Sequence, residues 1–167
     1  DITVNVTNLN DNTPSITSSA IFTAAENQTA IGTVTATDAD GNLNNLTYSV
    51  SGSELTISST GVLTFVNAPD YETKNTYTAT VTVSDGTNST TQDITVNVTN
   101  LNDNTPSITS GATFSAAENQ TAIGTVTATD ADGNLNNLTY SVSGSELAIN
   151  SSTGVLTFVT APDFETK

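Results

Sequence analysis

The chain contains no Cys, His, Met or Trp, and only two of its 167 residues are basic. The absence of Cys and His excludes disulfides, thiol nucleophiles, histidine general bases and the usual Cys or His ligands of zinc. Two basic residues against 17 acidic ones give a net charge of -15, so we expect neither nucleic acid nor an anionic membrane as a partner. No run approaches the roughly 18 consecutive apolar residues of a membrane span, so we also expect no membrane insertion.

Thr is the dominant residue type, with 35 copies, and together with Val it favours β-structure. Ile, Leu, Val and Phe make up 38 of the 167 residues, just above the roughly 20% below which chains tend to stay disordered. A core can therefore form, but we expect it to be thin. The sequence has no Met start and no signal peptide, so we expect it to be a window cut from a longer protein.

The chain repeats itself. Residues 1–74 recur as 93–167 with 68 of 74 aligned positions identical, and Asn150 is inserted in the second copy. This period exceeds the roughly 20–50 residues of a solenoid repeat and matches a small autonomous domain. We therefore expect residues 1–11 to be the C-terminal strand of a preceding repeat, 12–104 a complete repeat, and 105–167 a truncated second repeat.

Within one repeat, short runs of alternating polar and apolar residues are separated by turn signals. Residues 93–99 place Ile94, Val96 and Val98 on one face, and residues 75–84 alternate in the same way. Turn-forming Gly, Asn, Asp and Pro recur about every 8–12 residues, and no stretch shows the periodicity of a helix. The pattern predicts an all-β fold of seven-strand β-sandwiches in tandem.

Acidic residues gather at turns and at the repeat boundary. Asp38 and Asp40 form one pair two residues apart, and Asp70 and Glu72 form another. Neighbouring carboxylates repel each other, and Lys74 is the only basic residue of the complete repeat. A Ca²⁺ ion would resolve that repulsion, because it takes about 6–8 oxygen ligands from carboxylates, carbonyls and Asn side chains.

Five short motifs resemble those of the cadherin repeats, in family order and at family-like spacing. They are Ala25-Glu26-Asn27 (x-E-x), Asp38-Ala39-Asp40 (D-x-D), Asp70-Tyr71-Glu72 (the D-R-E position), Ser84-Asp85-Gly86, and Asn102-Asp103-Asn104 (the end of D-x-N-D-N). The resemblance covers the whole repeat, and it implies a Greek-key sandwich with Ca²⁺ bound between successive repeats. Near-identical, Thr- and Asn-rich, Cys-free repeats look most similar to the stalks of bacterial surface adhesins.

Carried over residue by residue, the resemblance implies three calcium ions at the junction near Asp103. The first two would be held by Glu26, Asp70, Glu72, Asp103, Asp132 and the Leu101 carbonyl. The third would be held by Asn102, Asp130, Asp132 and the carbonyls of Asn104 and Asn136. An equivalent third-type site upstream would use Asn10, Asp38, Asp40, Asp85 and carbonyls near Asn12 and Asn44.

The chain departs from the family pattern in three ways. Asn100 stands at the first position of D-x-N-D-N, but that side chain is not among the implied ligands. Tyr71 and its counterpart Phe164 occupy the middle of D-R-E, where we expect the aromatic ring to pack. The missing Trp excludes the adhesive mode in which an N-terminal Trp docks into a partner.

Other readings of the acidic residues fit less well. An EF-hand loop beginning at Asp38 would need Gly at its sixth position and Glu at its twelfth, which are Leu43 and Ser49. A glycosidase would use two carboxylates across a cleft, yet the chain has few aromatic residues to stack a sugar, so we expect no enzyme. A merely solvated acidic surface does not explain why the pairs recur at turns and at the repeat boundary.

We therefore expect a calcium-rigidified spacer in a long adhesin or surface protein, extracellular and of bacterial origin, whose partners are the neighbouring repeats. The alternative is a module that itself binds, either by homophilic association in a filament or sheath, or by binding a carbohydrate or another surface ligand. The near-identity of the two copies favours the spacer, because a recognition surface needs particular side chains and a spacer needs only length.

Overall fold

A computed structural model describes residues 1–41, 45–133 and 137–166. The chain divides into two compact units, unit 1 (Asp1–Leu101) and unit 2 (Asn102–Lys167). Among the described residues, no helix has the length and apolar character that crossing a membrane would require. The finer division predicted from the sequence, with boundaries after residues 11 and 104, stays a prediction.

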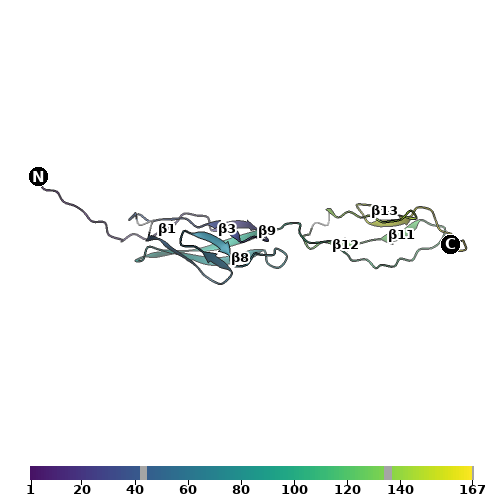
Figure 1. Ribbon diagram of the computed structural model, residues 1–167, viewed down its shortest axis with the longest axis horizontal. Coiled ribbons are helices and arrows are strands. Elements are labelled where there is room, and N and C mark those ends of the chain that lie inside the picture. Colours follow the sequence, from purple (N-terminus) through teal and green to yellow (C-terminus); the bar gives the residue numbers. More distant parts are fainter. Residues whose placement is uncertain (42–44, 134–136, 167) are drawn as a thin grey trace. The chain divides into compact units, whose positions relative to one another are not determined.

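Unit 1 is a β-sandwich of two antiparallel-rich sheets (Figure 1). One sheet has the order β2-β9-β8-β5, and the other has the order β3-β7-β6. A separate two-stranded ribbon joins β1 to β4. The bounds are β1 (Ser15–Ile16), β2 (Ile21–Ala25), β3 (Ala30–Thr33), β4 (Ala36–Thr37), β5 (Thr47–Val50), β6 (Leu55–Ile57), β7 (Val62–Phe65), β8 (Thr76–Ser84) and β9 (Ser89–Thr99).

The seven strands of the two main sheets confirm the predicted all-β sandwich. The connections β2–β3, β5–β6 and β7–β8 each pass from one sheet to the other, as in a Greek-key sandwich. The prediction missed the ribbon of β1 and β4, and it started β8 one residue early and β9 four residues late. Two-residue strands carry too little alternation to be recognised, and Ser89 to Gln92 contain no apolar residue.

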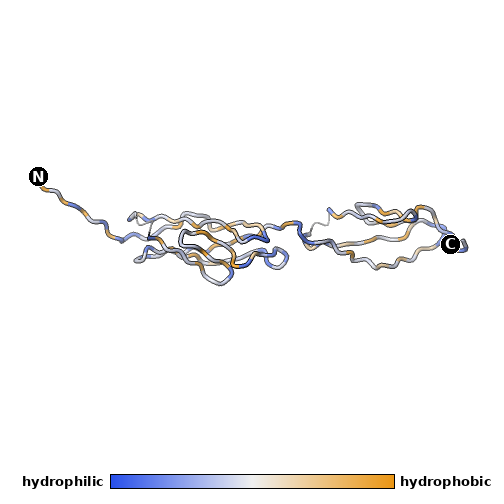
Figure 2. Tube along the Cα trace, in the orientation of Figure 1, coloured by the Kyte–Doolittle hydropathy of each residue, from blue (hydrophilic) through white to orange (hydrophobic). Residues whose placement is uncertain are grey.

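Alternation along the long strands builds the core. Val81 and Val83 of β8 and Val96 of β9 are fully buried, and they pack with Leu63 of β7 from the facing sheet. The side chains between them on β8 and β9 are mostly Thr and face outward. Hydrophobic and hydrophilic positions accordingly intermingle along the trace (Figure 2). The core is thin, as expected, because no strand gives it more than three buried apolar side chains.

One end of the unit 1 core closes with an aromatic pair. The rings of Phe65 and Tyr77 meet edge to face with their centroids 5.0 Å apart. Lys74 Nζ lies 4.4 Å from the Tyr77 ring centroid and 2.6 Å from Glu54 Oε1. Lys74, the basic residue of unit 1, therefore forms its salt bridge with Glu54, which lies on none of the five motifs.

Unit 2 repeats part of the unit 1 sequence almost unchanged but forms only part of the sandwich. Its strands are β10 (Ser107–Ile108), β11 (Ala122–Thr125), β12 (Ala128–Thr129), β13 (Leu147–Ile149) and β14 (Val155–Phe158), and β11-β14-β13 form one sheet. The counterparts of β2 and β5, at residues 113–117 and 139–142, form no strand. In unit 1 those two strands pair with β9 and β8, whereas no described segment of unit 2 forms a strand pair with residues 113–117 or 139–142.

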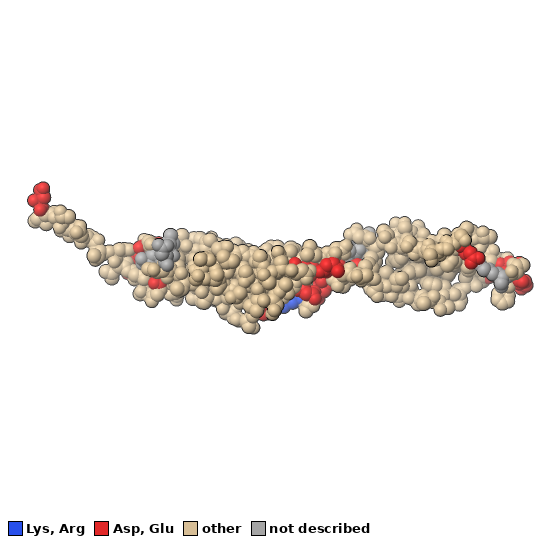
Figure 3. All heavy atoms as spheres, in the orientation of Figure 1, with Lys and Arg blue, Asp and Glu red and all other residues tan. Residues whose placement is uncertain are grey.

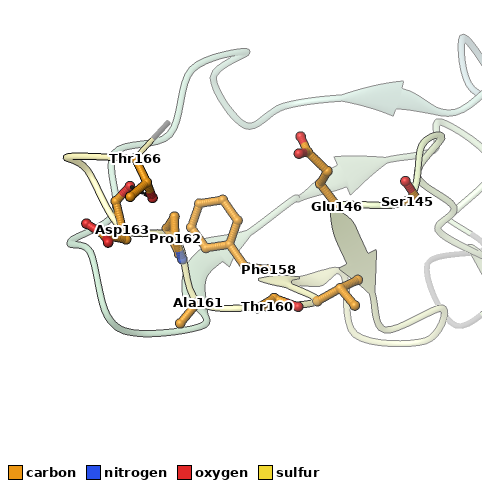
Figure 4. A pocket seen from close by; sticks show the side chains of 9 residues that line it. Ser145, Glu146, Phe158, Thr160, Ala161, Pro162, Asp163 and Thr166 are labelled. Carbon is orange, nitrogen blue, oxygen red and sulfur yellow. Dashed lines mark hydrogen bonds between the residues drawn. The ribbon is translucent and has the colours of Figure 1, made fainter.

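The core of unit 2 is open among the described residues. Leu156 is the one apolar side chain that is buried among the described residues of unit 2. Phe158, the counterpart of Phe65, lines an open pocket together with Glu146 and Pro162 (Figure 4). In unit 1 the Tyr77 ring packs against this aromatic position.

The single insertion is absorbed in the turn between β13 and β14. Ile149 pairs with Leu156 just as Ile57 pairs with Leu63, although one more residue separates the two strands in unit 2. Asn150 Oδ1 accepts hydrogen bonds from the backbone N–H groups of two turn residues at 3.0 Å each. The longer turn therefore satisfies its own backbone groups and leaves the strand register unchanged.

Candidate metal centre

Five of the predicted upstream ligands form one hydrogen-bonded network, here called the amino-end cluster: Asn10, Asn12, Asp38, Asp40 and Asp85. Asn12 donates its backbone N–H to Asp40 Oδ2 at 2.8 Å and its amide to Asp40 Oδ1 at 2.6 Å. Asp40 in turn donates its N–H to Asp38 Oδ1 at 2.8 Å. The Asn10 amide donates to the Asp85 carbonyl at 3.4 Å. Asn88 links the two groups, because its N–H donates to Asp85 Oδ1 at 2.6 Å and its amide donates to the Asn12 carbonyl at 2.9 Å. Three separate loops therefore meet at this end of unit 1.

Three oxygen atoms of the amino-end cluster are buried without a hydrogen-bond partner among the described residues. They are Asn10 Oδ1, Asp38 Oδ2 and Asp85 Oδ2. A buried oxygen without a partner loses its hydration and gains nothing in return, which is costly for a carboxylate. Two carboxylates and one amide oxygen are ligands that Ca²⁺ prefers. The donor set therefore fits a hard divalent cation.

Asp85 is oriented by its own turn. Its Oδ1 accepts the backbone N–H groups of Thr87 at 2.7 Å and Asn88 at 2.6 Å. The hydrogen bond from Asn88 is the main reason that the pKa of the Asp85 carboxyl lies below its ordinary value of 3.8. The ionised form is favoured, and Oδ2 is left for another ligand.

The described residues of the amino-end cluster do not form a complete set of ligands around one metal position. The oxygens of Asp38, Asp40 and Asp85 do not gather as one group of three within 4.8 Å. Both Asp40 oxygens accept N–H groups of residues 11 and 12. Asn44, whose carbonyl was expected here, lies outside the described residues.

Glu26, Asp70 and Glu72, here called the carboxyl-end cluster, gather at the opposite end of β9. Each offers a carboxylate oxygen, and these oxygens lie within 4.8 Å of one another. Glu26 is buried and fixed at both oxygens, because Oε1 accepts the Leu101 N–H at 2.6 Å and Oε2 accepts the Tyr71 N–H at 2.8 Å. All three are among the predicted ligands, and their role in holding a metal ion stays a prediction.

Local backbone geometry sets up the carboxyl-end cluster. Asn27 takes a left-handed conformation with φ 61° and donates its N–H to the Pro69 carbonyl, which holds the Glu26 turn against the Asp70 turn. The Thr73 hydroxyl donates to Asp70 Oδ2 at 2.9 Å and is the main cause of a lowered Asp70 pKa. Tyr71 packs against the core, as expected for the departure from D-R-E.

Unit 2 carries its own part of the predicted junction. Asn104 donates its backbone N–H to Asp132 Oδ2 at 2.9 Å and its amide to Asp132 Oδ1 at 2.7 Å. The hydrogen bond from the Asn104 side-chain amide is the largest cause of the lowered pKa of the Asp132 carboxyl. Asp132 is buried, and its N–H reaches Asp130 Oδ1 at 3.0 Å. This network repeats the Asn12–Asp40–Asp38 arrangement of the amino-end cluster.

The remaining predicted ligands are placed less fully. The Asp103 carboxylate accepts the Asn104 amide at 3.1 Å, and Asn102 is exposed. Asn136 lies outside the described residues. The ligand sets that combine unit 1 with unit 2 around Asp103 stay predictions.

A third carboxylate group escaped the sequence prediction. Glu118, Asp163 and Glu165 offer oxygens within 4.8 Å of one another in unit 2. They are the counterparts of the carboxyl-end cluster, so the repeat alignment alone could have identified them.

Across the visible surface, acidic side chains occupy a few patches, and most of the remaining surface carries no charge (Figure 3).

Comparisons with known proteins agree with this geometry. A family model described as "Cadherin domain" matches residues 20–99. Mouse protocadherin Fat 4 is 32% identical over 159 residues, covering 84% of this chain and 3% of that protein. Human protocadherin Fat 4 is 35% identical over 185 residues, covering 98% of this chain and 4% of that protein. The chain therefore spans only a few per cent of the length of these relatives.

A solved structure supports the fold. The extracellular repeats EC1-2 of human protocadherin-24 superpose with a TM-score of 0.77 at 22% identity, covering 95% of this chain and 82% of that one. These relatives are mouse and human proteins, so the bacterial adhesin context finds no support here and stays a prediction. Residues 20–99 are a cadherin domain, and the chain belongs to the cadherin repeat family.

Proposed function

We propose that the chain is a calcium-rigidified spacer of an extracellular adhesive or structural protein. The observation that carries the proposal is the set of three buried, unpartnered oxygens in the amino-end cluster, Asn10 Oδ1, Asp38 Oδ2 and Asp85 Oδ2. In the proposal, a Ca²⁺ ion takes these oxygens as ligands and removes the cost of burying them. The residues of the carboxyl-end cluster hold further ions at the junction with the next repeat.

The carboxyl-end cluster supports the same proposal independently. Three carboxylates with oxygens within 4.8 Å repel one another. Lys74, the basic residue of unit 1, donates hydrogen bonds to both carboxylate oxygens of Glu54 at 2.6 and 2.7 Å. Bound calcium supplies the positive charge that the chain itself lacks. Loss of the ions returns that repulsion and loosens the link between repeats.

The spacer role rests on the outer face of the sandwich. The outward positions of β8 are Thr76, Thr78, Thr80 and Thr82, and these small polar side chains recur without a large aromatic or a basic group among them. A surface of this kind offers few anchors of the type that dominate protein interfaces, which are Trp, Tyr and Arg. Length and stiffness are then what the repeats contribute to an extracellular protein.

Calcium removal tests the proposal. A ligand at about 100 times its dissociation constant stabilises the folded state by roughly 2.7 kcal/mol per independent site. We expect chelation to lower the melting temperature of the chain. We also expect it to change the small-angle scattering profile to that of a more flexible chain, and readdition of Ca²⁺ to reverse both effects. A chelator that changed neither the melting nor the scattering would rule out the proposal.

A further inference from the structure

Three of the eleven aspartates of the chain are followed directly by glycine: Asp40, Asp85 and Asp132. Glycine has no Cβ to shield its backbone nitrogen. An aspartyl–glycyl bond is therefore the one most open to attack by that nitrogen on the side chain of the preceding aspartate. The three dipeptides are chemically the same, so a difference in their reactivity in the folded chain reports how each carboxylate is held.

The Asp85 carboxylate folds forward over its own glycine. Its Oδ1 accepts the backbone N–H groups of Thr87 at 2.7 Å and Asn88 at 2.6 Å. These hydrogen bonds close a turn around Gly86 and hold Asp85 Cγ on the side of the Gly86 nitrogen. Gly86 and Thr87 are exposed, and a Cβ added to Gly86 would have nothing within 4 Å among the described residues. Water can therefore reach this peptide bond.

The carboxylates of the other two dipeptides are held by a distant segment. Asp40 Oδ2 accepts the backbone N–H groups of Asp11 at 3.0 Å and Asn12 at 2.8 Å, from residues 29 and 28 positions earlier in the chain. Asp132 Oδ2 accepts the Asn104 N–H at 2.9 Å, again from 28 positions earlier. These hydrogen bonds draw both carboxylates toward the earlier segment and not toward the glycine that follows.

Asp70 shows the forward arrangement without a glycine. Its Oδ1 accepts the N–H groups of Glu72 at 3.0 Å and Thr73 at 3.2 Å, as Asp85 Oδ1 does two and three residues ahead. The residue that follows is Tyr71, whose side chain packs against the core. A forward-held carboxylate and a following glycine therefore come together at Asp85.

We propose that Asp85 is a site of spontaneous isomerisation to isoaspartate. The Gly86 nitrogen forms a bond to Asp85 Cγ and loses its proton, and one carboxyl oxygen leaves as water, which gives a five-membered succinimide ring. Water then adds to the main-chain carbonyl carbon of Asp85 and breaks the bond from that carbon to the Gly86 nitrogen. The main chain now runs through Cβ and Cγ, and the former main-chain carbonyl becomes the free carboxylate. Composition, charge and oxidation state are unchanged.

The modification takes the turn after β8 apart. The main chain gains one methylene group, so the carboxylate moves away from the N–H groups of Thr87 and Asn88. The Asn88 side-chain amide donates to the Asn12 carbonyl at 2.9 Å, and the Asn10 amide donates to the Asp85 carbonyl at 3.4 Å. Isomerisation therefore loosens the hold of this turn on residues 10–12. The reaction needs no bound calcium, so its test is independent of the calcium proposal.

Ageing of the 167-residue chain tests the proposal, because one molecule holds the site and its controls. The folded chain and a sample unfolded in concentrated urea are incubated in calcium-free buffer at the same neutral pH and temperature. Circular dichroism checks that each sample stays folded or unfolded. Endoproteinase Asp-N cleaves before aspartate but not before isoaspartate, so a lost cleavage at unchanged mass marks an isomerised residue. Electron-transfer fragmentation in the mass spectrometer confirms its position.

In the folded chain we expect isoaspartate to accumulate at Asp85 at least about fivefold faster than at Asp40 or Asp132, because the orientation of the reacting groups sets the rate. Asp70 should accumulate less than Asp85, because Tyr71 covers the attacking nitrogen. In urea the three aspartyl–glycyl bonds should react at similar rates, because the hydrogen bonds that hold the carboxylates are lost.

Two results would overturn the proposal. The first is a folded chain in which Asp85 forms no isoaspartate, or forms it no faster than Asp40. The second is a preference for Asp85 that persists unchanged in urea, since neighbouring residues in the sequence and not the folded turn would then be its cause.

Discussion

Asp85 divides its two carboxylate oxygens between two tasks. Oδ1 accepts two backbone N–H groups and holds the turn after β8, while Oδ2 is buried without a described partner. An Asn at this position keeps one carbonyl oxygen for the turn but removes the negative charge. Substitution of Asp85 by Asn therefore separates the structural contribution of the side chain from its proposed contribution to metal binding.

We expect Asp85→Asn to weaken calcium binding by about tenfold or more, since the number of charged ligands sets calcium affinity. Isothermal titration calorimetry measures the loss. Asp93→Asn is the matched control, because Asp93 is exposed, lies on no motif and accepts a hydrogen bond from Thr80 at 2.7 Å. Equal affinities for the two variants would remove Asp85 from the site.

At the scale of the strand and turn, two glycines with similar backbones have different surroundings. Gly61 has φ +82°, and a Cβ added there would lie 2.2 Å from the Val34 carbonyl oxygen. Gly52 has φ +83°, and an added Cβ would have nothing within 4 Å. Both sites disfavour an L side chain because of the positive φ. Only at Gly61 does the missing side chain also allow the backbone at Val34 to lie close by.

Gly61→Ala should therefore destabilise unit 1 by about 1–3 kcal/mol more than Gly52→Ala, the usual range for overpacking. Urea unfolding followed by circular dichroism gives both free energies. The difference between the two variants isolates the contact with Val34, because the conformational cost is shared. If the two glycines proved equally replaceable, the turn would have room that the structure does not show.

Local patterns were enough to predict the long strands but not the pairing that makes a strand. The alternation of Ile94, Val96 and Val98 correctly identified β9. The carboxylates of Glu26, Asp70 and Glu72, which the spaced motifs grouped, lie close together in the structure. Residues 113–117 resemble β2 in sequence yet form no strand, because no described segment of unit 2 pairs with them as β9 pairs with β2. Burial of individual oxygens in the amino-end cluster depends on three loops meeting, which no single motif encodes.

For the whole molecule, two nearly identical sequences are expected to differ in stability. Unit 1 buries eleven apolar side chains in one cluster, whereas Leu156 is the buried apolar residue of unit 2 in the described part of the chain. Stability scales with the apolar area removed from water. The copy with fewer strands should therefore open first.

Hydrogen exchange read by mass spectrometry on the dilute chain checks this directly. Peptides from β13 and β14 should exchange at least about tenfold faster than their counterparts from β6 and β7, because local opening follows local contact density. The sequences compared are almost the same, so intrinsic exchange rates cancel. Matching protection in both copies would mean that local stability does not follow the number of buried apolar side chains.

The turn between β13 and β14 also makes the chain a candidate display scaffold. One copy of the hairpin closes with five residues between Ile57 and Leu63, the other with six between Ile149 and Leu156, and the pairing is the same in both. Lengthening a surface loop costs only about 0.6 kcal/mol for each doubling. A foreign peptide epitope inserted after Ser59 would be carried at the tip of this hairpin, and a tandem array would present it once per repeat.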